Sequence, residues 1–382
     1  MNITVLTGSV PSTTFIDAQV NAMAEDGFDI TIIGKKTGAF KYHQNVTVIV
    51  IPERVFAKVL FIIRLLLATG FRHFVGIVKS SRGIMQLYND LLFYLPIIYS
   101  KPDRIHVQWA AFIHNRDLLF DLYPHKILVS LRGAHINYTP ITTPEIKESY
   151  MRLFPRVHRF HAVSKAIANE AAQYGARPEA TNIIYSFVDD KLLQKEIQPK
   201  TPHPELRIIS VGRFFWKKGY EYALDALGML KREGIPFTYT LIAEGKTPAS
   251  IQYQLHQQDI NDEVHIVNGL PHNDVLKEIE KHDVLLLPSV EEGIANAVLE
   301  AMASGTPVIS TGVGGIAEVI QRGKSGYVVP ARDIHALKEA LSNLYSLNKE
   351  QRFAMATEAK KIVVEQHNRQ AFVDSFRKFY NY

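Results

Sequence analysis

Short apolar runs alternate with helical patterns along this chain, and this alternation constrains the fold more than any other feature of the sequence. In the first half the runs lie at residues 3–6, 29–34, 46–51, 104–109, 127–131 and 160–165. In the second half they lie at residues 206–211, 238–243, 264–267 and 284–287. Strands connected through helices favour a parallel sheet with helices on both faces. We therefore predict an α/β fold with two doubly wound, Rossmann-like sheets.

The chain is long enough for two domains with complete cores, because its 382 residues exceed the usual size of one domain. A polar stretch between the two sets of apolar runs contains Pro199, Pro202 and Pro204, which is typical of a stiff linker. We predict an N-terminal domain at residues 1–190, a C-terminal domain at residues 205–365 and a terminal segment at residues 366–382.

Composition limits the classes of protein that the chain could belong to. Cysteine is absent, which excludes disulfides and thiol chemistry and agrees with a reducing compartment. Hydrophobic residues at 47% and charged residues at 21% are ordinary for a soluble globular protein. The chain begins without a basic segment, and no apolar run reaches the roughly 20 residues of a spanning helix. We therefore expect a cytoplasmic protein with neither a signal peptide nor a membrane-spanning helix.

Residues 54–89 contain no acidic side chain but include an apolar run at residues 59–67. Their basic residues are Arg54, Lys58, Arg64, Arg72, Lys79 and Arg82. Two interpretations remain open: helices that lie on an anionic membrane at its inner face, or helices that pack on the sheet with their basic side outward. A net charge of +5 and a pI of about 9.0 agree with either. Nucleic-acid binding is disfavoured, because no binding motif accompanies the charge.

Two glutamates mark the most informative stretch of the second half. Glu292 follows the apolar run at residues 284–287, and Glu300 lies eight residues later on a helix expected to begin near Asn296. At about 1.5 Å per helical residue their carboxylates would be roughly 10 Å apart. That distance suits a sugar at one carboxylate and a ribose at the other, with a pyrophosphate between them. Backbone amides of the helix start and of the glycine-rich turn at residues 312–315 would face the phosphates.

A basic pair lies where the first strand of the second half ends. Gly212 and Arg213 end this strand, and Lys218 and Gly219 precede the next helix. Arginine can bind phosphate through two parallel hydrogen bonds, and lysine acts as a point charge. We predict a diphosphate site at Arg213 and Lys218, with Lys217 as the less favoured lysine.

These motifs resemble those of retaining glycosyltransferases of the GT-B fold, in particular the group called family four (glycosyl transferases group 1). The resemblance includes the Glu-x7-Glu signature at Glu292 and Glu300, the basic pair, the strand entering the signature, the turn leaving it and the segment at residues 326–333. It implies two Rossmann-like domains facing across a cleft, the first binding the acceptor and the second the nucleotide-sugar. It also implies that the terminal segment is a helix crossing back to the first domain.

The resemblance implies roles for residues of the second domain. Glu292 would bind donor sugar hydroxyls beside the anomeric carbon, and Glu300 would bind the ribose hydroxyls. Arg213 and Lys218 would stabilise the diphosphate as it leaves. The remaining donor-binding residues would be Gly212, Gly269, Gly293, Ile294 and Ala295.

In the first domain the resemblance is looser. Gly8 lies in the polar stretch after the first strand, residues 7–14, which we expect to be a loop. The resemblance implies that Gly8 lets the donor or acceptor approach closely, and we include it among the donor-binding residues. Arg132 and His135 stand where many relatives have His-Gly-x-Asp, with arginine in the histidine position. Arg132 would hold a carboxylate or hydroxyl of donor or acceptor. His106 is expected to be structural.

The predicted function is retaining transfer of a hexosyl or related sugar from a nucleotide-sugar, UDP- or GDP-linked, to a saccharide or lipid-linked saccharide. The resemblance implies polysaccharide or glycolipid biosynthesis, with neither a metal nor another cofactor. Two alternatives remain open: a non-catalytic protein on the same fold that binds nucleotide-sugar or a membrane surface, and a GT-B nucleotide-sugar epimerase. An NAD dehydrogenase is disfavoured, because no Gly-x-Gly-x-x-Gly opens either half.

Overall fold

The structure is a computed structural model that describes residues 1–201 and 203–381. Pro202 of the predicted linker, Tyr382 of the terminal segment and the side chain of Arg72 lie outside the described residues. By its contacts the chain divides into two compact units. Unit 1 comprises Met1–Val163, Ile167–Ile184 and Val373–Tyr382, and unit 2 comprises Ser164–Ala166 and Tyr185–Phe372.

Unit 1 is built on a seven-stranded parallel sheet in the described residues, with the strand order β3-β2-β1-β4-β5-β6-β7. The first three strands are β1 (Asn2–Val10), β2 (Asp29–Lys36) and β3 (Val46–Ile51). The others are β4 (Arg104–Val107), β5 (Ile127–Leu131), β6 (Arg159–Ala162) and β7 (Thr181–Ile183). The order reverses at β1, so the carboxyl ends of β1 and β4 lie at a topological switch point where ligands bind in such sheets.

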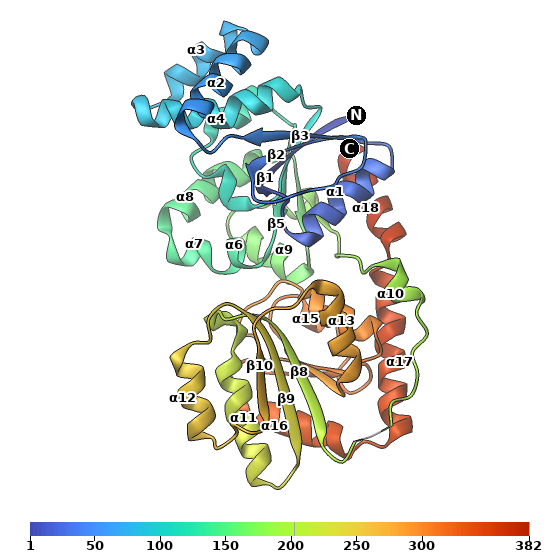
Figure 1. Ribbon diagram of the computed structural model, residues 1–382. Helices are drawn as coiled ribbons and strands as arrows, with labels where there is room; N and C mark the ends of the chain where they lie inside the picture. The colour runs from blue at the N-terminus through green and yellow to red at the C-terminus, as the bar shows by residue number, and fades with distance from the viewer. Residues whose placement is uncertain (202, 382) are drawn as a thin grey trace. The chain divides into compact units, whose positions relative to one another are not determined.

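Helices cover both faces of this sheet (Figure 1). One layer consists of α2 (Val55–Thr69), α3 (Phe71–Ser80), α4 (Ile84–Ser100), α5 (Asp117–Leu122), α6 (Gly133–Asn137), α7 (Thr139–Thr142), α8 (Pro144–Leu153) and α9 (Lys165–Ala172). The other contains α1 (Thr14–Glu25) and the part of α18 (Arg369–Asn381) that belongs to unit 1. Arg377 of α18 forms an ion pair with Asp26, which follows α1. The rings of Tyr380 and Phe28 make an edge-to-face contact with their centres 5.5 Å apart.

The first strand is longer than the sequence indicates. β1 continues to Val10, so the prediction of a loop at residues 7–14 was wrong for residues 7–10. Gly8 therefore lies within the strand. Ser9 and Val10 pair with Lys35 and Lys36 of β2 after a shift of register beyond Leu6. Because Val10 is fully buried in this pairing, a polar stretch is accommodated as strand.

Unit 2 contains a six-stranded parallel sheet in the described residues, with the strand order β10-β9-β8-β11-β12-β13. The strands are β8 (Leu206–Arg213), β9 (Phe237–Glu244), β10 (Val264–Val267), β11 (Val284–Leu287), β12 (Val308–Thr311) and β13 (Tyr327–Val329). Its helices are α10 (Asp190–Gln194), α11 (Tyr220–Arg232), α12 (Ala249–Gln257), α13 (His272–Lys281), α14 (Asn296–Ala303), α15 (Ile316–Val319), α16 (Ile334–Ser346) and α17 (Lys349–Gln366).

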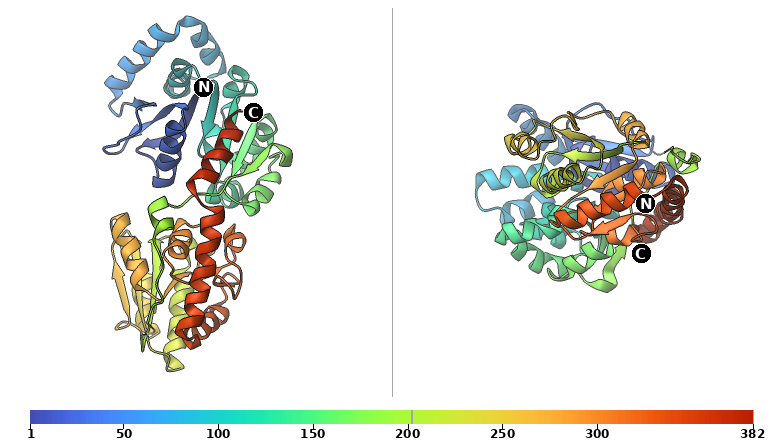
Figure 2. Two further views of the ribbon diagram at one scale, coloured as in Figure 1. Left: turned by 90° about the vertical axis from the view of Figure 1, so that its right-hand side faces the viewer. Right: turned by 90° about the horizontal axis from the view of Figure 1, so that it is seen from below.

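The second sheet packs against helices on both faces through two apolar clusters. One joins the sheet to α11, α12 and α16, and the other joins it to α10, α13, α14 and α17. Figure 2 shows α17 along one side of this sheet. The prediction of an α/β fold with two doubly wound sheets is therefore confirmed.

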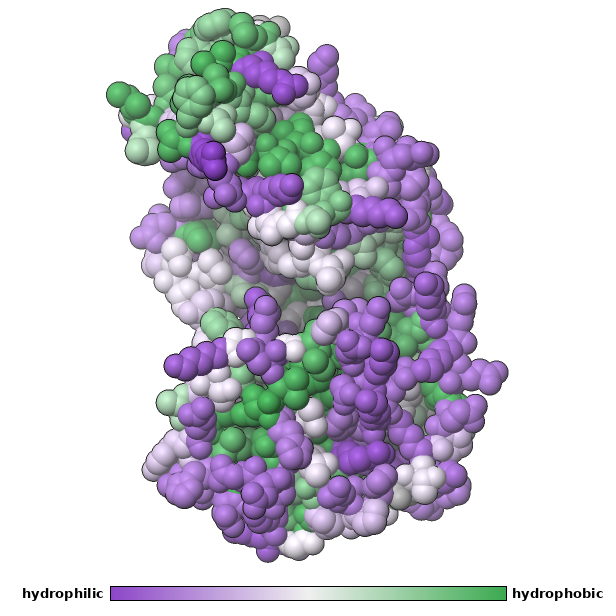
Figure 3. Space-filling view, viewed as in Figure 1, coloured by the Kyte–Doolittle hydropathy of each residue, from purple (hydrophilic) through white to green (hydrophobic). Residues whose placement is uncertain are grey.

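Apolar side chains are unevenly distributed over the surface of unit 1. They gather over α2, α3 and the start of α4 (Figure 3). In the described residues no helix has both the length and the apolar character that crossing a bilayer requires.

Candidate functional site

Two loops at the carboxyl ends of β8 and β11 form the centre of the candidate site in unit 2. The first follows β8 and contains a single 3₁₀ turn, η4 (Trp216–Lys218), before α11 begins. The second, residues 288–295, connects β11 to α14. Val290 donates its backbone N–H to the carbonyl oxygen of Lys217 at 2.7 Å, so the two loops are bonded directly.

Each loop contributes two charged side chains, and they form two neighbouring ion pairs. Lys218 Nζ lies 2.6 Å from Glu292 Oε1, and Lys217 Nζ lies 2.8 Å from Glu291 Oε2. Ser289 Oγ also donates to Glu292 Oε1 at 3.2 Å. The side chains of Lys218 and Glu292 are only 17% and 11% exposed, so water screens their attraction weakly. The structure thus brings together the lysine predicted to bind phosphate and the glutamate predicted to bind sugar.

Two glycines allow these loops to approach each other closely. Gly219 has φ of +63°, and a Cβ there would lie 2.2 Å from the carbonyl oxygen of Pro288. Gly314 has φ of +56°, and a Cβ there would lie 2.0 Å from the carbonyl oxygen of Glu292. Neither approach is available to a larger residue without movement of backbone. Glycine at these two positions therefore determines where Lys218 and Glu292 lie.

Glu300 lies on α14, as predicted, and its side chain is 18% exposed. Burial raises the pKa of this carboxyl above its ordinary value, and the neighbouring His272 opposes the shift. His272 Nε2 is 3.6 Å from Glu300 Oε1, and the imidazole is 57% exposed. The histidine begins α13, which follows the loop containing Gly269. An exposed base therefore faces the carboxylate predicted to bind the ribose.

The other predicted residues of unit 2 lie around this centre. Gly293 accepts a hydrogen bond from the amide of Gly315 at 2.6 Å, and Ala295 is the residue that precedes α14. Ile294 packs on the apolar cluster beneath α14. Arg213 is exposed at the end of β8 and makes no ion pair with any residue that the structure describes. The remaining two are Gly212, where a Cβ would meet Lys218 Cε at 3.2 Å, and Gly269, at φ of +63° after β10.

In unit 1, Arg132 follows β5 and is buried, with 9% of its surface exposed. Its Nη2 donates to Gln108 Oε1 at 2.9 Å and to Gln19 Oε1 at 3.3 Å, and its guanidinium lies 4.6 Å from the centre of the Phe15 ring. Burial lowers the pKa of Arg132 to about 9, which leaves it cationic at neutral pH. Among the described residues no carboxylate contacts it, so two amides and an aromatic face hold an uncompensated cation that can bind an anionic or hydroxyl group.

A chain of buried hydrogen bonds lies beside Arg132. Tyr380 Oη and Ser130 Oγ each lie 2.8 Å from a ring nitrogen of His106, and Ser130 Oγ lies 2.8 Å from His161 Nδ1. Burial lowers the pKa of His106 well below its usual value and that of His161 to about 3, so both rings are neutral. His106, which is fully buried, is a packing residue as predicted, and no solvent reaches it.

His135 and Gly8 line different parts of the surface of unit 1. The His135 ring lies against Trp109 with ring centres 5.2 Å apart. Gly8 borders a hollow of about 300 Å³ beside the second halves of β1 and β2. Its wall is largely apolar and includes Ile51, Phe93, Phe112, His114 and Arg116. A Cβ at Gly8 would approach Phe112 Cζ to 3.3 Å, so glycine keeps this side of the hollow open.

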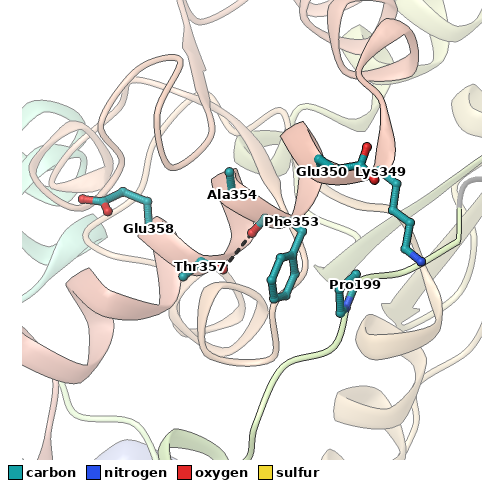
Figure 4. A pocket seen from close by; sticks show the side chains of 7 residues that line it. All are labelled: Pro199, Lys349, Glu350, Phe353, Ala354, Thr357 and Glu358. Carbon is teal, nitrogen blue, oxygen red and sulfur yellow. Dashed lines mark hydrogen bonds between the residues drawn. The ribbon is translucent and has the colours of Figure 1, made fainter.

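A second hollow, of about 590 Å³, lies on unit 2 between Pro199 and α17 (Figure 4). Its floor includes Phe353 and Thr357, and the Thr357 hydroxyl donates within the helix to the Phe353 carbonyl oxygen at 2.8 Å. None of the motif residues lines it, so we do not assign it to the site.

Sequence reasoning missed several partners of the predicted residues. His272, which faces Glu300, carries no motif, and only its place after the Gly269 loop could have indicated it. Gln19, 113 positions from Arg132 in the chain, gave no signal at all. Ser289 was within a recognised motif but had no predicted role.

Comparison with known proteins finds a family model that matches part of the chain. Residues 194–362 match the family model for glycosyl transferases group 1. The chain is 31% identical over 254 residues to a Salmonella typhimurium protein, WcaL, described as a colanic acid biosynthesis glycosyltransferase. It is 30% identical over 246 residues to the amylovoran biosynthesis glycosyltransferase AmsK of Erwinia amylovora. These matches cover 65% and 63% of this chain but only 60% of each relative's length.

Solved structures match the fold over the whole chain. Sucrose-phosphate synthase from Thermosynechococcus elongatus gives a TM-score of 0.77 at 15% identity and covers 100% of this chain and 98% of its own. Alr3699/HepE of Anabaena, solved in complex with UDP, gives a TM-score of 0.73 at 14% identity, with 99% of each chain covered. The chain therefore has the GT-B fold of glycosyltransferases, and the group 1 match falls on unit 2.

Proposed function

We propose that the protein is a retaining glycosyltransferase that moves a hexosyl or related sugar from a nucleotide-sugar to a saccharide or lipid-linked saccharide. The proposal is supported by the group 1 match to residues 194–362 and by relatives that are named as glycosyltransferases. The observation that carries it is the contact of 2.6 Å between Lys218 and Glu292. A cation suited to phosphate and a carboxylate suited to sugar hydroxyls lie together at the junction of the two loops.

Donor binding would exchange the partners of this ion pair. The diphosphate carries more negative charge than a single carboxylate, so Lys218 would transfer its hydrogen bond from Glu292 to phosphate oxygens. Glu292 Oε1 would then accept hydrogen bonds from hydroxyls of the donor sugar in place of the one from Lys218. One event would thereby neutralise the leaving group and orient the sugar. Binding of diphosphate alone would break a weakly screened ion pair without replacing the interactions of Glu292.

Arg213 and Lys218 would carry the charge that develops on the departing diphosphate. The exposed guanidinium of Arg213 makes no competing ion pair among the described residues, which leaves it available for a bidentate contact. The amides of Gly293 and Ile294 would add donors. These cations supply what a divalent metal otherwise provides, so we propose that transfer needs no metal. The leaving phosphate would take the acceptor proton on the face that it leaves, which retains the anomeric configuration.

The acceptor side of the reaction belongs, in this proposal, to unit 1. The largely apolar hollow beside Gly8 suits a sugar ring face or the apolar part of a lipid-linked saccharide. Arg132 and His135 would contact anionic or hydroxyl groups of donor or acceptor. The names of WcaL and AmsK refer to colanic acid and amylovoran biosynthesis, and we propose that this chain likewise acts in polysaccharide biosynthesis.

A panel of UDP- and GDP-linked sugars tests the proposal. Each donor is screened by thermal shift and then by release of nucleoside diphosphate, with and without oligosaccharide acceptors. We expect one donor class to stabilise the protein and to turn over faster with an acceptor. Stabilisation without turnover would indicate the non-catalytic alternative. Conversion of the free donor to its epimer would indicate the epimerase. No stabilisation by any nucleotide-sugar would contradict the donor site itself.

A further inference from the structure

Unit 1 exposes an apolar surface on α2, α3 and the start of α4, here called the α2–α3 surface. Eleven of the 23 exposed large hydrophobic side chains of the described residues lie between positions 55 and 85. They are Val55, Phe56, Val59, Leu60, Ile63, Leu67, Phe71, Val75, Val78, Ile84 and Met85. Figure 3 shows these helices as the largest apolar area on that face of unit 1. A contiguous patch of this kind usually marks an interaction site.

The spacing of these residues shows that the exposure follows a helical stripe. Phe56, Leu60, Ile63 and Leu67 recur at intervals of three or four residues, so they occupy one side of α2. The opposite side is also apolar, because Ile62 and Leu65 are buried in the core of unit 1. A surface helix normally has a polar face toward water. α2 therefore presents its second apolar face to a partner that the sheet of unit 1 does not supply.

Basic side chains border the surface. Arg54, Arg64, Lys79 and Arg82 are exposed, and Lys58 is half-buried. None of these five forms an ion pair with a described residue, and residues 54–89 contain no acid that could neutralise them. The surface thus combines exposed apolar groups with unpaired positive charge. A partner that fits this surface must offer negative charge to the basic side chains and, below that charged layer, an apolar interior to the hydrophobic side chains.

We propose that the α2–α3 surface docks onto an anionic phospholipid bilayer. Lipid headgroups would meet the basic residues while Phe56, Leu67 and Phe71 enter the boundary of the acyl chains. With 15 residues, α2 is too short to cross the bilayer and lies in its plane. A second copy of the chain fits less well, because a two-fold contact would bring like charges together. The charge pattern thus selects lipid over self-association.

Vesicle flotation with the full-length protein tests this inference. We expect binding to vesicles of phosphatidylcholine with phosphatidylglycerol, weak binding to phosphatidylcholine alone, and release by added salt. Leu67→Ser with Phe71→Ser should weaken partitioning of the protein into anionic vesicles about tenfold or more, because Leu67 is 77% exposed and Phe71 is 66% exposed in the free protein. The matched control is Ile141→Ser with Tyr253→Ser, which removes apolar groups 69% and 66% exposed elsewhere.

Charge is tested separately from apolar contact. Arg64→Gln with Lys79→Gln should weaken binding to the anionic vesicles by about fivefold for each charge removed. Lys324→Gln with Lys361→Gln lowers the net charge equally at exposed positions in unit 2 and should have little effect. Equal effects of the two pairs would reduce the interaction to net charge and overturn the assigned surface.

Three other outcomes would also overturn the proposal. These are absence of binding to either vesicle, equal binding to both, and a dimer in sedimentation that Leu67→Ser with Phe71→Ser dissociates. The assay contains no nucleotide-sugar. Its result is therefore independent of the donor panel, and either proposal can fail while the other stands.

Discussion

At the scale of single residues, two adjacent lysines provide a matched test of the donor site. Lys217 and Lys218 form ion pairs of 2.8 and 2.6 Å with adjacent glutamates, but the proposal assigns phosphate only to Lys218. Lys218→Ala should lower kcat about 100-fold, as loss of a group that stabilises developing charge does, and Arg213→Ala should act similarly. Lys217→Ala should retain kcat within a few-fold. Steady-state kinetics on the donor found by the panel gives the comparison.

Near-normal turnover in both Lys218→Ala and Arg213→Ala would contradict the charge assignment. Equal losses in Lys217→Ala and Lys218→Ala would show that the ion pairs only support the loops. Thermal melting of each variant separates this second outcome from a direct effect on catalysis.

Glu300 gives a prediction for pH. Burial raises the pKa of its carboxyl above the ordinary value for a glutamate, which is about 4.3. Glu300 therefore takes up a proton at a higher pH than an exposed glutamate does. The protonated form accepts hydrogen bonds from ribose poorly, so affinity for nucleoside diphosphate should fall as the pH is lowered from 7.5 toward 5. The same raised pKa has the opposite effect on the stability of the free protein, which should increase as the pH falls because the folded state binds the proton more tightly than the unfolded chain.

Calorimetric titration of UDP or GDP at pH 7.5, 6.5 and 5.5 measures this dependence. Glu300→Gln should bind more weakly at every pH and show a flatter profile, and protonation of the phosphates cancels because both proteins see the same ligand. If the two profiles run parallel, Glu300 does not contact the nucleotide.

Residues within local motifs could be predicted, and their distant partners could not. Glu292, Glu300 and Lys218 stand in short segments whose local chemistry is legible, and the structure brings Lys218 and Glu292 into contact. Gln19 lies on α1, which follows β1, and Arg132 follows β5. They meet because β1 and β5 flank β4 in one sheet, and this strand order is set by packing over the whole unit. No local pattern encodes such a contact, and the same holds for His272 beside Glu300.

At the scale of elements, the loop that carries Glu292 depends on the turn after β12. Gly314→Ala would place a Cβ 2.0 Å from the Glu292 carbonyl oxygen and should displace this loop. We expect kcat to fall more than tenfold and the melting temperature to fall by several degrees. Gly323→Ala is the control, because Gly323 has φ of +76° but no atom within 4 Å of an added Cβ.

The control carries the cost of the left-handed backbone without the clash. If Gly314→Ala and Gly323→Ala lose activity equally, backbone strain alone explains the effect and the close approach has no importance for the site.

The buried histidines of β4 and β6 make unit 1 sensitive to acid. Burial depresses the pKa of both His106 and His161, the latter to about 3, whereas both titrate near 6.5 when unfolded. The unfolded chain therefore binds more protons, and stability is lost as the pH falls below about 6.5. Linkage gives a loss on the order of 2 kcal/mol for His161 between pH 7 and pH 5, and His106 adds to this loss in the same direction.

Thermal unfolding at pH 7, 6 and 5 measures this loss. His161→Asn should lower the melting temperature at pH 7 but reduce its further decrease on acidification, because one titrating group is gone. An unchanged pH dependence in the variant would contradict the assignment of the depressed pKa to this ring.

Elements with strong apolar runs were predictable, and marginal ones were not. The buried strands β5 and β11 are continuous runs of Ile, Leu and Val broken only by Ser130. The end of β1 is polar, and it forms strand because β2 supplies hydrogen-bond partners beyond Leu6. The three residues of β7 are too short for a periodic signal. In both cases tertiary pairing overrides the local sequence.

At the scale of the whole molecule, the repeated strand–helix alternation was sufficient to predict two parallel sheets, because each run is bounded by turn residues and followed by a helical pattern. Strand order within each sheet was not predicted, since it depends on packing between helices that are distant in sequence. Retention of configuration and independence of metal remain predictions, because they depend on the reaction path.

The configuration of the product at its anomeric carbon decides whether transfer proceeds with retention. The protein is incubated with the α-linked nucleotide-sugar and the acceptor identified by the panel, in excess EDTA, and the new linkage is assigned from the coupling of its anomeric proton by NMR. We expect an α-linked product formed at an undiminished rate, because Arg213 and Lys218 would neutralise the leaving diphosphate and the acceptor would attack on the face from which the diphosphate departs. A β-linked product would contradict the mechanism, and a rate lost in EDTA and restored by magnesium or manganese would contradict the role of the two cations.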